Sequence, residues 1–156
     1  MPETLCGFND VPGTGGAPGR ELLMAYGPTL IVAVGFDSNY TPAQPWPVPT
    51  PGITGIHALV DTGATESCID NLLAAHLNLP IIDRRPISGV HGTQIVNVYM
   101  GQIHVPSLLF TIYGAFSGVD LAAGGQAHRV LIGRTFLKDF TMVYEGFTGT
   151  VKLSRP

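Results

Sequence analysis

The sequence predicts an all-β domain with one or two short helices, in which the whole chain forms a single lobe. Three observations support this prediction. Apolar residues alternate with other residues over several short segments, as they do along a half-buried strand. The 20 glycines and 13 prolines favour many turns and few long helices. Hydrophobic residues make up 45% of the 156 residues, enough for a chain of this length to bury a core.

Residues 1–27 are rich in glycine and proline, and we expect them to be a flexible lead-in to a domain that spans residues 28–156. The run of glycines between Val11 and Gly19 raises the question of a phosphate-binding loop. That motif needs Lys followed by Ser or Thr after its last glycine, whereas Arg20 and Glu21 follow here. A phosphate-binding loop is therefore disfavoured.

The domain opens with two predicted strands separated by an inserted loop. Apolar side chains such as Leu30 and Val32 alternate along residues 30–36, and a second strand covers residues 55–60. Between the strands, at about residues 37–53, prolines recur every few positions. Because proline lacks the N–H that a sheet needs, we expect this segment to be an extended surface loop, with a polyproline II ligand for a partner as the alternative.

A short helix and a long hairpin follow the second strand. Asp70 is a good N-cap for a helix over residues 70–79, and Pro80 ends that helix. Alternating apolar residues then predict a hairpin over residues 86–105. Its tip is expected at residues 89–92, where glycines flank Val90 and His91.

Five shorter elements complete the prediction. The closing strands fit two roles equally well, a sheet shared with a second copy of the chain or one edge of the chain's own barrel. The elements are a strand at residues 108–113, a loop of small residues at 114–128, a strand at 130–132, a short helix at 133–140 and a closing hairpin with strands at 141–144 and 150–153.

Charge and composition disfavour several classes of function. A net charge of -3 argues against a nucleic-acid-binding domain, which normally carries a basic patch. No apolar run approaches the roughly 18 residues of a membrane span, and residues 1–10 do not have the pattern of a secretory signal. Cys6 and Cys68 are too few for a disulfide framework, so we expect free thiols and a cytoplasmic location. No metal or other cofactor is expected, because the following histidines lack the spacing of a zinc site: His57, His76, His104 and His128.

The sharpest chemical feature is Asp61-Thr62-Gly63, which directly follows the apolar segment Ala58 to Val60. An acidic side chain at the end of a buried strand is aimed by a rigid element. Gly63 permits a close approach of the backbone, and the Thr62 hydroxyl can hold the turn. Taken alone, this motif is also typical of an ordinary capped strand end.

A second segment, Val130-Leu131-Ile132-Gly133-Arg134, repeats the pattern of an apolar strand that ends in glycine, and a short helix follows it. Together with the Asp61 motif and the glycine-tipped hairpin, it resembles the retropepsin-like aspartic proteases. The resemblance covers roughly residues 28–153 and is closer to the single-domain cellular and bacterial members than to the compact viral ones. It implies a retropepsin-like acid-protease barrel with one lobe per chain.

The resemblance implies an aspartic endopeptidase in which two aspartates share one proton across a water molecule. One aspartate acts as base and the other as acid, because two like charges so close together cannot both ionise. The chain carries a single such motif, since neither Asp37 nor Asp120 is followed by Thr-Gly. We therefore expect an obligate twofold homodimer with Asp61 from each copy at the axis. The alternative is a fold of this type that dimerises or binds peptides with little or no hydrolysis.

The resemblance also gives the other site residues their roles by position. The catalytic loop is Asp61, Thr62 and Gly63, with Thr62 bracing the loop of the second copy. Substrate contacts are expected from Ala64, Thr65 and a flap tip made of Gly89, Val90, His91 and Gly92, while Leu131, Ile132, Gly133 and Arg134 support the loop from behind.

One detail of that assignment departs from the family, and two further residues each have an alternative interpretation. Its arginine normally pairs with an acidic residue just after the Asp-Thr-Gly-Ala loop, and Thr65 stands there instead, so we expect Arg134 to pair with Glu66 or to brace the dimer less firmly. Cys68 is read as a small buried residue, with a thiol of lowered pKa as the alternative. His91 is read as a solvated turn residue, with a pH-sensitive contact to substrate as the alternative.

Overall fold

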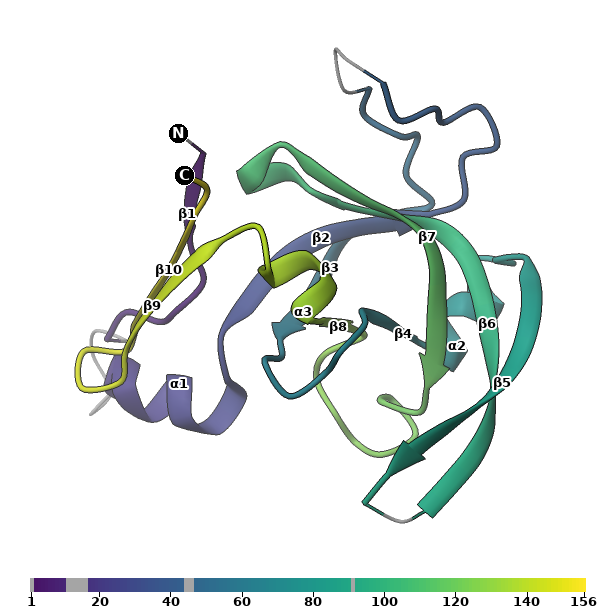
Figure 1. Ribbon diagram of the computed structural model, residues 1–156. Helices are drawn as coiled ribbons and strands as arrows, with labels where there is room; N and C mark the ends of the chain where they lie inside the picture. The colour runs from purple at the N-terminus through teal and green to yellow at the C-terminus, as the bar shows by residue number, and fades with distance from the viewer. Residues whose placement is uncertain (1, 11–16, 44–46, 91) are drawn as a thin grey trace.

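The computed structural model describes residues 2–10, 17–43, 47–90 and 92–156 (Figure 1). Part of the glycine run (11–16), part of the proline-rich loop (44–46) and the flap residue His91 lie outside the described residues. In chain order the elements are β1 (Glu3–Leu5), α1 (Gly19–Tyr26), β2 (Thr29–Gly35), β3 (Ile53–Val60), β4 (Cys68–Asp70), α2 (Asn71–His76), β5 (Ile81–Gly89), β6 (Gly92–Val105), a 3-10 turn η1 (Pro106–Leu108), β7 (Phe110–Val119), β8 (Val130–Ile132), α3 (Arg134–Leu137), β9 (Thr141–Glu145) and β10 (Thr150–Ser154).

The strands form two sheets, and the larger one closes on itself. Its order is β2-β3-β8-β4-β7-β6-β5, and an additional pairing between β2 and β6 closes the ring, with β5 attached to β6 outside it. The smaller sheet has the order β1-β10-β9 and lies to one side of the barrel in Figure 1, where the two chain ends meet. The predicted all-β class is confirmed.

The core fills the barrel with the apolar side chains that alternation had placed on one face of each strand. Leu30, Val32 and Val34 of β2 are buried, as are Ala58 and Val60 of β3. Both strands run close to their predicted bounds. The same alternation leaves Ile31 half exposed on the outer face of β2.

The expectation of a flexible lead-in before residue 28 was wrong for the part of it that the structure describes. Residues 3–5 pair with β10 as a third strand, and residues 19–26 form α1. Cys6 and Leu23 are buried in the same hydrophobic core as the barrel strands. Composition alone suggested flexibility, but these two apolar side chains anchor the segment to the closing hairpin and the core.

The loop expected at residues 114–128 was wrong over its first part, because β7 continues to Val119. Small residues such as Ala115 and Ser117 pair with Met100 and Val98 of β6 across the hairpin. A strand of low intrinsic propensity is thus held by the long partner strand beside it. The flap hairpin likewise begins earlier than predicted, since β5 starts at Ile81.

Asp70 caps α2 as predicted, and it also connects that helix to a distant loop. Its carboxylate is fully buried and accepts a hydrogen bond from the N–H of Leu73 at 3.2 Å. It also accepts hydrogen bonds from the N–H groups of Leu121 and Ala122, at 2.9 and 3.0 Å. The helix itself ends at His76, earlier than Pro80 suggested.

The closing hairpin forms as predicted, with β9 and β10 paired along their length. Among the described residues, β10 pairs with β1 on its other side. The hairpin therefore belongs to the small sheet and not to the large barrel. Among the described residues, no helix is long and apolar enough to cross a membrane.

Candidate active site

The Asp61 loop leaves the end of β3 and is anchored to the neighbouring strand β8. The two strands run parallel, with Val60 opposite Ile132. The Asp61 N–H donates to the Ile132 carbonyl oxygen at 2.9 Å, and the Asp61 Oδ1 accepts from the Gly63 N–H at 2.8 Å. The carboxylate is therefore oriented both by its own turn and by the strand behind it.

The segment that begins α3 holds the other half of the loop through its backbone. The Arg134 N–H donates to the Ala64 carbonyl oxygen, and the Thr135 N–H donates to the Thr65 carbonyl oxygen, both at 2.9 Å. These bonds join the two sequence segments that carry the family resemblance. They also turn both carbonyl groups toward α3.

The Arg134 side chain completes this frame, with a partner different from the expected one. Its guanidinium donates to the Thr62 carbonyl oxygen at 2.7 Å and to the Thr65 Oγ1 at 3.0 Å. The expected pairing of Arg134 with Glu66 was wrong. The neutral hydroxyl of Thr65 accepts this hydrogen bond at the position where the resemblance predicts an acidic partner.

Glu66 pairs instead with an arginine of the flap hairpin, which the sequence reasoning missed. The Arg85 Nη2 lies 3.0 Å from the Glu66 Oε2 and 3.3 Å from the Ser117 Oγ. Arg85 belongs to β5, so this ion pair connects the flap strand to the residues that follow the Asp61 loop. Both side chains are partly exposed, which keeps the strength of the pair modest.

Ser67 is a second supporting residue that the sequence reasoning missed. It is buried, and its Oγ accepts a hydrogen bond from the Gly133 N–H at 3.0 Å. A Cβ atom at Gly133 would lie 2.5 Å from the backbone carbonyl group of Glu66, so only glycine fits there. The predicted supporting role of Gly133 thus has a concrete form, a close approach between two backbone segments.

The remaining predicted supports lie in β8, directly behind the loop. Ile132 is fully buried and Leu131 is half-buried. β8 is short and lies between β3 and β4, pairing with both. The loop side of this frame faces outward: Asp61 and Ala64 are half-buried, whereas Thr62, Gly63 and Thr65 are exposed.

The flap tip is formed where β5 meets β6. Gly89 pairs with Gly92, and Val90 is 99% exposed at the turn between them. In Figure 1 this hairpin tip projects below the barrel, on the same side as the loop between β3 and β4. In the view of Figure 1 the Asp61 loop and the described part of the flap hairpin thus leave the barrel toward the same side.

Cys68 begins β4, close to the candidate catalytic loop. Burial raises the pKa of its thiol to about 11, with further contributions from the negative charges of Glu66 and Asp61 and a partial offset from Arg85. The thiol also contacts the Glu66 carbonyl oxygen at 3.6 Å. The alternative of a thiol with lowered pKa is therefore wrong.

Among the described residues, no group of three or more His, Cys, Asp or Glu side chains is arranged to hold a metal ion. Two histidines bond threonine hydroxyls. His128 bonds the Thr29 Oγ1 through its Nε2 at 2.9 Å, and His104 bonds the Thr111 Oγ1 through its Nδ1 at 2.9 Å.

The sequence matches no model of a known protein family and no characterised protein. The assignment of a function therefore depends on the chemistry of the residues described above.

Proposed function

We propose that this chain is an aspartic endopeptidase that acts as a homodimer, with Asp61 of each copy meeting at a twofold axis. The observation that carries the proposal is the anchoring of the Asp61 loop by residues 132–135. Catalysis by a carboxylate needs the group held in place before substrate binds, so that little reorganisation remains for the reaction. The backbone bonds and the Arg134 side chain provide such a frame.

The chemistry proposed is the hydrolysis of a peptide bond by water. One Asp61 carboxylate takes a proton from a water molecule while the water oxygen attacks the scissile carbonyl carbon. The protonated Asp61 of the second copy donates its proton to the carbonyl oxygen, which gives a tetrahedral intermediate. The C–N bond then breaks: the Asp61 carboxyl that took the proton from water donates it to the amine nitrogen, and the ionised Asp61 of the second copy takes a hydroxyl proton from the intermediate, which restores the shared proton. No cofactor takes part in these steps.

A single copy supplies only half of this machinery, which is why the proposal requires a dimer. Thr62 and Gly63 are exposed at the apex of the loop, available for contact with a second loop. The small sheet β1-β10-β9 ends on either side in a strand without a further neighbour among the described residues. Its edges offer one means for two copies to associate.

An extended peptide would lie between the Asp61 loop and the flap hairpin. Since the carbonyl groups of Ala64 and Thr65 bond to α3, the Gly63 carbonyl and the Thr65 N–H are the backbone groups proposed to bind the peptide. Closure of the hairpin, with Gly89, Val90, His91 and Gly92 at its tip, would shield the reacting groups from bulk water.

The test is incubation of the purified chain with denatured proteins at pH about 4 to 7, the range in which one proton can be shared between two carboxyl groups. The expected result is internal cleavage that Asp61→Asn abolishes while the dimer, measured by light scattering, is retained. Binding of peptide without cleavage at any pH would support the non-hydrolytic alternative. Cleavage by a species that light scattering shows to be monomeric would contradict the paired-aspartate proposal.

A further inference from the structure

One edge of β7 is uncovered along the first two thirds of the strand. On one side β7 (Phe110–Val119) pairs with β6 from Phe110 to Ser117. On the other side its partner within the described chain is β4, which pairs only with residues 117–119. Among the described residues, the segment 110–116 therefore has a paired strand on one side only.

The pairing pattern identifies which backbone groups this edge presents. In an antiparallel ladder, alternate residues direct both N–H and C=O away from the partner strand. The Met100 N–H donates to the Pro80 carbonyl oxygen, away from β7, so Met100 and Ala115 form a pair without mutual backbone hydrogen bonds. By alternation the same holds for Tyr113 and Thr111. These three residues direct their N–H and C=O groups toward the uncovered edge.

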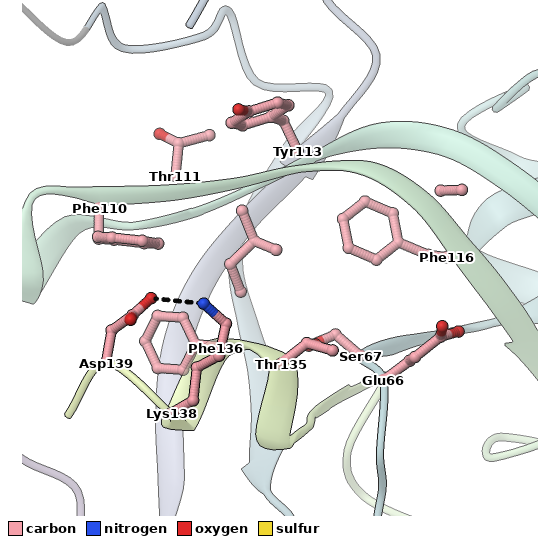
Figure 2. Close-up of a pocket in the computed structure, with 12 residues that line it drawn as sticks. Glu66, Ser67, Phe110, Thr111, Tyr113, Phe116, Thr135, Phe136, Lys138 and Asp139 are labelled. Carbon is pink, nitrogen blue, oxygen red and sulfur yellow. Dashed lines mark hydrogen bonds and ion pairs between the residues drawn. The ribbon is translucent and has the colours of Figure 1, made fainter. Parts of the chain in front are cut away.

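A cavity of about 410 Å³ follows that edge (Figure 2). β7 forms one wall, and α3 with the residues after it forms the opposite wall, where Phe136 lies, while Glu66 and Ser67 close one end. Consecutive β7 residues such as Ile112 and Tyr113 both line the cavity, although their side chains lie on opposite faces of the strand. This is expected of a cavity that follows the edge of a strand. A cavity of roughly 150 Å³ already holds a benzene ring, so there is room here for two apolar side chains.

The cavity exists because the chain turns away from β7 just before β4. Residues 66 and 67 would continue the parallel pairing of β4 alongside Ala115 and Phe116. Instead the Ser67 Oγ accepts from the Gly133 N–H, and the Thr65 carbonyl accepts from the Thr135 N–H, which draws this stretch to α3. The contacts that anchor the Asp61 loop are thus the ones that leave the edge of β7 open.

We propose that this edge is a second peptide-binding site, which accepts an extended segment of a partner protein as an additional strand next to β7. The edge groups of Thr111, Tyr113 and Ala115 would exchange hydrogen bonds with the backbone of the segment. Apolar side chains at alternate positions of the segment would enter the cavity between β7 and Phe136. This site is independent of the proposed catalytic activity, since it uses neither the apex of the Asp61 loop nor the flap.

The test uses the full chain with Asp61→Asn, so that the probe is not consumed by cleavage. The probe is a ten-residue peptide of alternating valine and threonine with a lysine at each end. Amide hydrogen exchange is followed by NMR with and without the peptide. At a peptide concentration ten times its Kd, exchange at Thr111, Tyr113 and Ala115 is expected to slow about tenfold.

Two matched controls test strand addition itself. One control peptide carries N-methyl groups on its valines, and the other carries them on its threonines. N-methylation removes a backbone donor, so protection should be lost only with the peptide whose methylated residues would direct their N–H groups toward β7. In the protein, Ala115→Pro removes the edge N–H without breaking a bond to β6 and should abolish binding, whereas Ala115→Val should keep it.

Three results would overturn the proposal. The first is protection confined to the flap and the Asp61 loop, which would mean that the peptide binds only at the candidate active site. The second is equal binding of the two methylated peptides. The third is an absence of protection at all three amides with the probe at millimolar concentration.

Discussion

The Arg134 guanidinium bonds both the carbonyl oxygen of Thr62 and the hydroxyl of Thr65, so one side chain ties the apex of the Asp61 loop to its end. The Thr65 hydroxyl is neutral, but the guanidinium that donates to it is charged, so this hydrogen bond is itself charge-assisted. The loop is therefore anchored both by the backbone bonds of residues 132–135 and by the Arg134 side chain.

Removal of the Thr65 hydroxyl should weaken this tie. Thr65→Val is expected to lower the free energy of unfolding by about 1 kcal/mol, because one hydrogen bond to a charged group is lost at an exposed position. If the tie orients Asp61, proteolytic activity falls as well. Urea denaturation and peptide cleavage measure the two effects. Thr65→Ser keeps the hydroxyl and should behave like the natural chain, and equal losses in both variants would contradict the role of the hydroxyl.

Gly133→Ala should be strongly destabilising. The new methyl group would meet the backbone of Glu66 at 2.5 Å, and backbone cannot move aside as a flexible side chain can. We expect a loss of about 1–3 kcal/mol in the free energy of unfolding, as for other overpacked positions. The matched control is Gly89→Ala, because no atom lies within 4 Å of a Cβ there, and its effect should stay within about 0.5 kcal/mol. Similar denaturation midpoints for the two variants would refute the close approach.

The sequence allowed these loop residues to be predicted, but not all of their partners. The Asp61 and Gly133 segments are short, local patterns of apolar residues and turn residues, which single-sequence reasoning can detect. The pairs Glu66–Arg85 and Arg134–Thr65 join residues 19 and 69 positions apart. Which of two nearby side chains faces an arginine depends on the register of folded strands. Local pattern does not contain that information.

Residues 3–5 and 114–119 show the same limit for the fold. The first was expected to be part of a flexible lead-in and the second part of a loop, yet β10 holds the first as a strand, and β6 and β4 hold the second. Strand formation here depends on a partner far away in the sequence, and strand propensity is correspondingly dependent on context. The elements with strong internal alternation, such as β2 and β3, needed no such information.

The ion pair between Glu66 and Arg85 should couple the flap to the loop while contributing little to global stability. Arg85→Gln is expected to change the free energy of unfolding by at most about 1 kcal/mol, since both side chains are partly exposed. Exchange of the flap amides should nevertheless become faster. The double variant with Glu66→Arg and Arg85→Glu restores opposite charges and should recover slow exchange. If the flap amides of the double variant still exchange fast while its stability is unchanged, the coupling is excluded.

Stability should decline as the pH falls below about 6.5. Burial lowers the pKa of His104, and burial together with the nearby His57 lowers that of His128, both from 6.5. The unfolded chain therefore binds protons at a higher pH than the folded one, so folding stability present above 6.5 is lost as the pH falls toward the folded pKa values. Thermal unfolding at successive pH values measures this loss. His128→Gln removes one titrating group and should reduce the slope of stability against pH below 6.5, leaving the part that comes from His104. An unchanged slope would contradict the assignment to His128.

Cys68 should be slow to react despite its place beside the candidate active site. Its pKa of about 11, against an ordinary value of 9.0, leaves roughly a hundredfold less thiolate than an unperturbed thiol at the same pH, and the thiolate is the reactive form. Alkylation by iodoacetamide at pH 8, followed by mass spectrometry in a Cys6→Ser background, should proceed about a hundredfold more slowly than for free cysteine. Because the negative charge of Glu66 contributes to the raised pKa, Glu66→Gln should accelerate the reaction. A fast reaction in the natural chain, or no response to Glu66→Gln, would show that the thiol lies in a different electrostatic environment.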